Sequence, residues 1–202
     1  MPESFEKNTK TMRQYCVFWV GQLISLFGSS IVQFACGWWL TQQSSNPIYM
    51  SIFLFMTFVP HIFLGPFAGV IADKYSRKTV IIIGDSYQAV ITLTLILVTN
   101  WISLTIPVFI IALAVRFLGQ CFHYPATNAV AATMIPDQYL QRFNGIRSFM
   151  ESLIRMASPI IGALLYTKFS LRQLFWIDVI TFGIAVVPML YIPIPHFYKK
   201  PT

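Results

Sequence analysis

Charged residues are scarce in this sequence. Asp, Glu, Lys and Arg together make up 10% of its 202 residues, whereas hydrophobic residues make up 56%. An ordinary soluble domain carries about 25% charged residues, and a soluble chain of this size could not bury so much apolar surface. The composition therefore excludes a soluble globular protein and indicates a chain whose solvent is lipid.

Cysteine is also rare, and its three positions show no pattern. Cys16, Cys36 and Cys121 lie far apart in apolar runs, so neither a disulfide framework nor a metal site is predicted. His61 and His123 are single histidines without ligand spacing, and we interpret them as satisfied or cavity-lining residues. Phosphate-binding glycine loops and nucleophile motifs are missing. We therefore predict no metal, no cofactor and no enzyme activity.

The charge that is present is mostly positive, with a formal net charge of +7. On a soluble protein this excess would indicate an acidic partner such as nucleic acid. Here the lysines and arginines lie mostly in short loops between apolar runs, which is typical of the positive-inside rule for membrane proteins. No nucleic-acid partner is therefore predicted.

Six apolar stretches are long enough to cross a bilayer, which takes about 20 helical residues. Their expected ranges are 15–40, 48–72, 79–98, 104 to at least 124, 143–166 and 174–192. The connections are alternately uncharged and basic, so cytoplasmic termini place most basic residues inside, with Lys168 and Arg172 as exceptions. The sequence thus predicts an all-α membrane protein: a cytoplasmic segment at 1–14, a six-helix transmembrane domain at 15–193 and a cytoplasmic segment at 194–202.

The loop between the second and third spans carries a charged motif, formed by Gly69, Asp73, Lys74, Arg77 and Lys78. Such charges can form and break salt bridges when helices shift, so the loop could act as a conformational latch; the alternative is that they only set the topology. The stretch resembles the signature loop of the major facilitator superfamily, G-x-x-x-D-[RK]-x-G-R-[RK]. Ser76 stands where the family has a glycine, a residue that tolerates positive φ.

Three charges share one face of the fifth span, because Arg147, Glu151 and Arg155 follow one another at intervals of four residues. One interpretation is a self-paired ladder that neutralises charge inside the membrane. The other is a protonatable carboxylate that couples transport to protons.

Further charges lie in other spans. Arg116 in the fourth span should face a cavity or a carboxylate, because a bare arginine at that depth costs at least about 2.5–3.5 kcal/mol; it also resembles the family's arginine motif. Asp85 in the third span lies nearer the inner face and could join the network of Asp73. Asp178 in the sixth span lies within about two turns of the outer face, so hydration is the alternative to a functional role.

A polar stripe marks the first span, where Gln22, Ser29 and Gln33 recur at spacings of seven and four. In the superfamily this helix lines the central substrate cavity, and the alternative is interhelical hydrogen bonding. In the fifth span, Gly145, Pro159 and Gly162 fit the spacing of the superfamily's antiporter motif, G-x8-G-x3-G-P-x2-G-G. This partial match favours an exporter.

The segments 18–29 and 175–178 resemble the drug-exporting branch that includes macrolide-efflux and siderophore-export proteins. The resemblance implies proton-coupled efflux of a drug-like amphipathic compound across the cell membrane, and with it antibiotic resistance. Family members contain twelve helices, and this chain corresponds to the N-terminal six. It is expected to be a truncated half, a half that pairs with a second chain or copy, or a non-transporting remnant, scaffold or regulatory partner.

Overall fold

The computed structural model describes residues 2–99 and 105–192, with side chains described for residues 11–71, 74–99 and 105–192. The described residues form six helices and no strand, which confirms the predicted all-α class. The helices are α1 (Pro2–Gln43), α2 (Pro47–Lys74), α3 (Arg77–Val98), α4 (Ile106–Met134), α5 (Asp137–Tyr166) and α6 (Leu171–Tyr191). By length and composition, all six could cross a membrane.

Helices α4 and α5 are longer than the apolar pattern predicted. The helix α4 continues through Pro125 to Met134, and α5 begins at Asp137 rather than near residue 143. Hydropathy marks only the lipid-embedded part of a helix, whereas backbone hydrogen bonding continues until a stop signal. That signal is Pro136, because the residue before a proline is pushed to extended backbone, as Ile135 is.

Helix starts are specified locally by capping residues. Asn46 accepts a hydrogen bond from the Ile48 amide at the start of α2, and Ser170 forms a capping box with Gln173 at the start of α6. Ser76 caps α3 in the same way, with φ of −56°. The turn into α3 therefore requires no positive φ, which explains how serine replaces the glycine of the family pattern.

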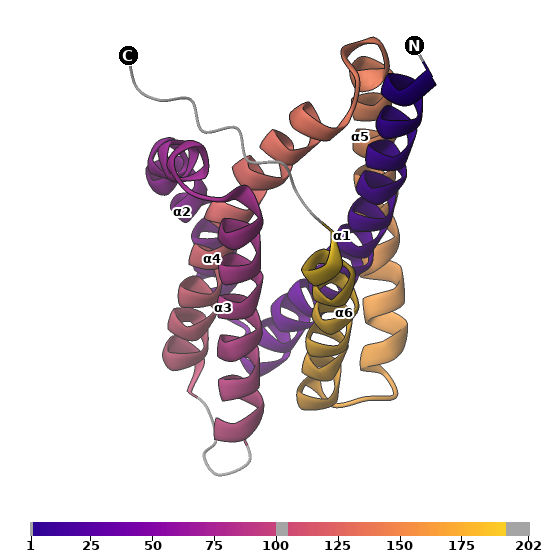
Figure 1. Cartoon of the computed structure of the whole chain (residues 1–202). Coiled ribbons are helices and arrows are strands. Elements are labelled where there is room, and N and C mark those ends of the chain that lie inside the picture. Colours follow the sequence, from indigo (N-terminus) through magenta and orange to yellow (C-terminus); the bar gives the residue numbers. More distant parts are fainter. Residues whose placement is uncertain (1, 100–104, 193–202) are drawn as a thin grey trace.

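The six helices form two interleaved groups (Figure 1). Helix α1 packs along α6 and α5, α4 packs along α2 and α3, and α3 meets α6 between the groups. Exchanging the first three helices with the last three reproduces this contact pattern, and three helices earlier in the chain the direction is reversed. This is the arrangement of an inverted repeat. The start of α1 lies at the same end as the α2–α3 and α4–α5 connections.

Two apolar clusters close the bundle at its two ends. One, at the end where α1 begins, contains Tyr15, Ile81 and Met134; the other, at the opposite end, contains Leu40, Phe109 and Phe175. The buried polar and charged side chains lie at intermediate positions along the helices: Gln22, Thr57, Asp85, Thr92, Arg116, Thr127, Ser158 and Asp178. Polar groups are therefore concentrated in a layer between two apolar seals.

Small residues let the helices approach closely at this layer. A Cβ atom on Gly119 of α4 would lie 2.9 Å from the carbonyl oxygen of Gly84 in α3. A Cβ atom on Gly28 of α1 would collide with the Thr181 side chain of α6. These two contacts belong to equivalent helix pairs of the repeat, and such close approach is typical of packing in membranes.

Candidate functional site

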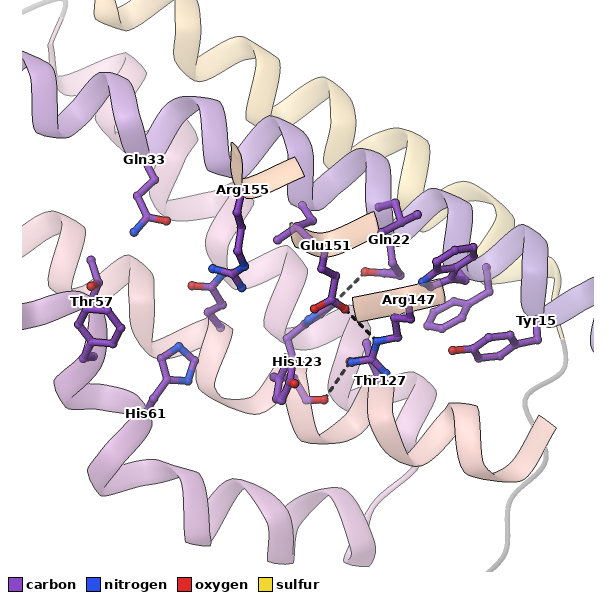
Figure 2. A pocket seen from close by; sticks show the side chains of 17 residues that line it. Tyr15, Gln22, Gln33, Thr57, His61, His123, Thr127, Arg147, Glu151 and Arg155 are labelled. Carbon is purple, nitrogen blue, oxygen red and sulfur yellow. Dashed lines mark hydrogen bonds and ion pairs between the residues drawn. The ribbon is translucent and has the colours of Figure 1, made fainter. Parts of the chain in front are cut away.

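A cavity of about 280 Å³ lies in the polar layer between α1, α2, α4 and α5 (Figure 2). Its polar lining residues include Gln22, Gln33, Thr57, His61, Gln120, His123, Thr127, Arg147, Glu151 and Arg155. Of the predicted cavity residues, Gln22 and Gln33 line it. Ser29 does not, because its hydroxyl donates to Asp178 on the side of α6.

Glu151 enters this cavity from the middle of α5. It lies about 21 Å along the helix from Asp137, deeper than the sequence estimate, because α5 begins earlier than expected. The Nε of Arg147 donates to Glu151 Oε1 over 2.8 Å, and the guanidinium carbon lies 5.7 Å from the centroid of the Tyr124 ring. The Glu151 side chain keeps 23% of its surface exposed, so protons and small ligands can reach it.

The predicted three-charge ladder is only half formed. Arg155 lines the cavity one turn further along α5, but the only ion pair of the ladder among the described residues joins Arg147 to Glu151. In Figure 2 the Glu151 carboxylate points toward Arg147. The helix spacing brings both arginines within reach, and the tertiary environment selects one of them. Arg155 therefore leaves a positive charge in the cavity wall.

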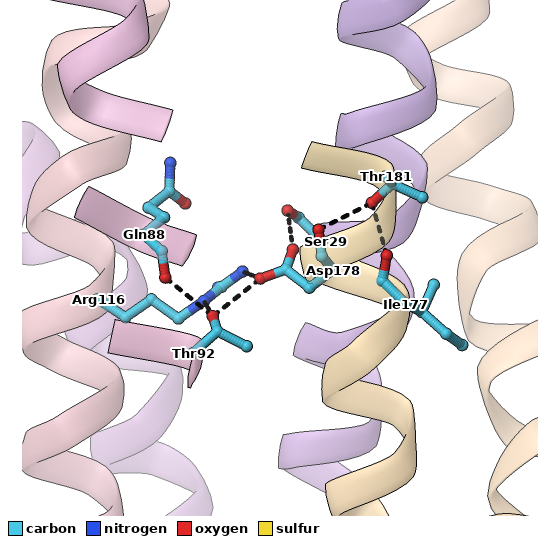
Figure 3. A network of polar contacts seen from close by, with 7 residues as sticks. All are labelled: Ser29, Gln88, Thr92, Arg116, Ile177, Asp178 and Thr181. Carbon is cyan, nitrogen blue, oxygen red and sulfur yellow. Dashed lines mark hydrogen bonds and ion pairs between the residues drawn. The ribbon is translucent and has the colours of Figure 1, made fainter. Parts of the chain in front are cut away.

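A second polar centre joins four helices (Figure 3). Arg116 of α4 donates through Nη2 to Asp178 Oδ2 of α6 over 2.5 Å, and its Nε donates to the Thr92 hydroxyl of α3 over 3.0 Å. The hydroxyl of Ser29 in α1 donates to the other carboxylate oxygen over 2.5 Å. Asp178 retains only 4% exposure, so hydration does not explain this carboxylate. Arg116 has the carboxylate partner that its depth required.

A third cluster involves His123, which the sequence treated as a single histidine. Its Nε2 lies 3.3 Å from Asp85 Oδ1 of α3 and 2.8 Å from Gln22 Oε1 of α1. Asp85 was expected to join the network of Asp73, but the structure places it against this imidazole. The signal in the sequence was weak: Asp85 follows Gly84, and His123 lies one helical turn after Gly119, at the close contact of α3 with α4.

The basic residues of the predicted latch contact distant helices. Arg77 Nη1 donates to the carbonyl oxygen of Ala129 in α4 over 2.7 Å. Lys78 Nζ donates to the carbonyl oxygens of Leu190 and Ile192 at the end of α6, over 3.0 Å each. The first turn of α3 is thus tied to both neighbours.

The other latch residues are placed differently. Lys74 is exposed, with its ammonium 5.8 Å from the Tyr75 ring. A Cβ atom on Gly69 would meet nothing within 4 Å, so close packing within this chain does not require that glycine. The side chain of Asp73 lies outside the described residues.

The antiporter-like residues of α5 do not act as one unit. A Cβ atom on Gly162 would lie 2.8 Å from the Phe34 ring of α1, so this glycine allows close packing. A Cβ atom on Gly145 would meet nothing within 4 Å. Pro159 lies inside α5 and lacks the amide that would bond the carbonyl one turn earlier. Among the described residues, no group of three or more His, Cys, Asp or Glu side chains could hold a metal.

The sequence profile of the Major Facilitator Superfamily matches residues 18–202. The chain belongs to this family. Macrolide efflux protein A of Streptococcus pyogenes is 30% identical over 190 residues, which cover 94% of this chain and 47% of that protein. Macrolide efflux protein A of Enterococcus faecalis is 33% identical over 138 residues, covering 68% of this chain and 43% of that protein.

A third relative, the Staphyloferrin A transporter of Staphylococcus aureus, is 25% identical over 181 residues, covering 89% of this chain and 45% of that protein. The chain spans about half the length of the curated relatives it matches. The predicted resemblance to the superfamily and to its efflux and siderophore branch is therefore confirmed. With six membrane-competent helices, the chain is a multi-pass membrane protein, and in bacteria such transporters lie in the plasma membrane.

Proposed function

We propose that this chain is one six-helix half of a secondary transporter that exports a drug-like amphipathic compound in exchange for protons. Family membership and the macrolide efflux relatives support the transport class. The cavity supports the substrate class, because apolar side chains such as Phe18, Leu26 and Phe58 surround its polar groups. The proposed activity includes the second half of the transporter, which would complete the cavity wall.

The observation that carries the proposal is the Glu151 carboxylate, paired to Arg147 within the cavity at mid-helix. When the carboxylate is ionised, its charge offsets one of the two cavity arginines. When it binds a proton, the ion pair is lost and the net charge of the three groups rises from +1 to +2. A cationic amphipathic substrate would then be repelled. Proton binding and substrate binding would therefore exclude each other, as antiport requires.

The loop from Gly69 to Lys78 is proposed to act as the latch of this cycle, at a cytoplasmic end that also holds both termini. The support is that Arg77 and Lys78 hold α3 to α4 and α6. Those bonds must break if the helices shift against one another. Most basic loop residues lie at the same end, as the positive-inside rule requires of a cytoplasmic surface.

The test is proton-driven efflux of a macrolide or a cationic dye from cells that express this chain. We expect Glu151→Gln to reduce proton-driven efflux at least about tenfold, because the amide can still accept from Arg147 but cannot bind and release a proton. Asp137→Asn is the matched control, since Asp137 is an exposed acid on the same helix outside the cavity. Equal efflux by Glu151→Gln and the parent chain would remove Glu151 from the coupling step.

A second candidate function rests on the length of the chain, which is about half that of its relatives. In that case it serves as a membrane scaffold, a regulatory partner or a non-transporting remnant. The two candidates separate when the chain is expressed alone, with a second six-helix chain, or as a crosslinked pair of copies. Efflux in either paired form supports the half-transporter. No efflux in any form, together with intact folded protein, supports the second candidate.

A further inference from the structure

The cluster of Asp85, His123 and Gln22 contains two buried atoms without a hydrogen-bond partner. The Oδ2 of Asp85 has no donor, and the Nε2 of Gln22 has no acceptor. Between these side chains lies the single Nε2 of His123, within reach of both Asp85 Oδ1 and Gln22 Oε1. One ring N–H cannot donate fully to two acceptors, so the cluster has unused hydrogen-bonding capacity in a site that excludes most water.

Burial restricts the charge states that this cluster can adopt. The Asp85 side chain is 6% exposed, and a buried charge without a partner costs several kcal/mol. Two forms avoid that cost: carboxylate with imidazolium, or carboxylic acid with neutral imidazole. The forms differ by the transfer of one proton between His123 Nε2 and Asp85 Oδ1, and their net charge is the same. One proton is therefore held by the pair in either form.

Gln22 suits both forms, because its amide has an acceptor at one end and donors at the other. Its Oε1 accepts from a protonated His123 Nε2, as the 2.8 Å contact shows. A half-turn of the amide would place an N–H at the same point, where it could donate to a deprotonated Nε2. The side chain can thus follow the proton without a change in the backbone.

The cluster also has a route to the cavity. His123 and Gln22 line the cavity, whereas Asp85 lies behind them. The His123 side chain is 21% exposed, so its ring can exchange a proton with water or a ligand there. The charged groups that face it are the Arg116–Asp178 pair of α4 and α6, which is internally neutralised, together with three residues of α5 and one of α2 that line the cavity: Arg147, Glu151, Arg155 and His61.

We propose that Asp85, His123 and Gln22 form a proton-holding site distinct from Glu151, which exchanges its proton with the cavity through the His123 imidazole. The existence of this site does not depend on transport. Its use as a coupling site rests on the proposed function, and there it would supply a second proton-binding step to the same cavity.

The test is a pH titration of the whole chain in lipid nanodiscs by NMR, with ¹⁵N-labelled histidine and ¹³C-labelled aspartate. The His123 signal is assigned with a His61→Gln variant. In the parent chain, the Asp85 carboxyl and the His123 ring should report the same transitions, because they share a proton. In Asp85→Asn, the midpoint for His123 should move by at least about one pH unit, a tenfold change in proton affinity, because the opposing charge is gone.

Two results would overturn the proposal. Independent transitions of Asp85 and His123 in the parent chain would show that they share no proton, and this reading needs no variant to fold. An equally large change at His123 in Glu151→Gln would show that the imidazole belongs to the Glu151 network. Asp137→Asn should leave the His123 midpoint unchanged within about 0.3 pH unit, as expected for a distant exposed acid.

Efflux measurements keep this proposal separate from the proposed function. If Asp85 and His123 titrate together but the chain and its paired forms export nothing, the proton site stands and the transport proposal fails. If efflux is proton-driven and Asp85→Asn keeps the parent's pH profile, the cluster has no part in coupling. We expect instead that Asp85→Asn changes the pH profile of efflux, while Asp137→Asn does not.

Discussion

The ion pair between Arg116 and Asp178 offers the sharpest test of how this bundle is held together. Both side chains are nearly inaccessible, at 3% and 6% exposure, and their atoms lie 2.5 Å apart. With an effective dielectric constant of about 20, the attraction at that distance is about 7 kcal/mol. The loss of hydration costs several kcal/mol for each ion, so the net contribution of the pair is much smaller than its attraction.

We therefore expect a strong dependence on which partner is removed. Arg116→Met or Asp178→Leu alone should lower the free energy of unfolding by about 3–5 kcal/mol, because each leaves a buried charge unpaired. The double variant should lose less than about 2 kcal/mol, because both charges are gone and the Thr92 hydroxyl keeps the Gln88 carbonyl as its acceptor. The coupling energy between the two sites would then be at least about 3 kcal/mol.

The assay is reversible unfolding of the purified chain in mixed detergent micelles, followed by tryptophan fluorescence. Arg142→Met serves as the control, since Arg142 is an exposed arginine on α5 and should change stability by no more than about 0.5 kcal/mol. Single variants that each lose less than about 1 kcal/mol would refute the reasoning. Such a result would mean that water or another side chain reaches the remaining charge.

Three further changes test the packing and the loop. Gly119→Ala should destabilise the chain by about 1–3 kcal/mol in the same assay, because the new Cβ lies 2.9 Å from a backbone carbonyl of α3; Gly183→Ala, with open space around it, should be neutral or stabilising by up to about 1 kcal/mol. Lys78→Ala should raise hydrogen exchange in the last turn of α6 about tenfold, as one lost charged hydrogen bond of about 1.5 kcal/mol implies, whereas Lys74→Ala should leave it unchanged. Ser76→Gly should cost only a few tenths of a kcal/mol in unfolding measurements, because glycine is also a good N-cap; a loss above about 1 kcal/mol would contradict the capping role.

Interactions within one helix could be predicted from the sequence, and those between helices largely could not. The spacing of four residues predicted that Arg147 and Glu151 lie side by side, and they pair. The same spacing applied equally to Arg155, which does not pair with the carboxylate. Helical periodicity describes which residues share a face, but the neighbour against that face decides which contact forms.

The polar stripe of α1 shows the same limit. Gln22 and Ser29 are seven residues apart and nearly eclipsed on an ideal helix. Yet Gln22 lines the cavity and contacts His123, whereas Ser29 donates to Asp178 of α6. Helix α1 lies between the cavity and α6, so neighbouring positions along one narrow face meet different surroundings. The role of His123 was missed for a related reason: its partners are far away in the sequence.

The sequence by itself determined the solvent of this protein, the number of its spans and the starts of its helices. These follow from local quantities: the apolar length needed to cross a bilayer, and capping side chains such as Asn46 and Ser170 that bond to their own helix. Only the tertiary structure decided the partners of the buried charges. Arg116 meets Asp178 across 62 residues of sequence, and Ser29 meets it across 149. A charge in lipid must find a partner, but the close packing of helices at small residues determines which one it reaches.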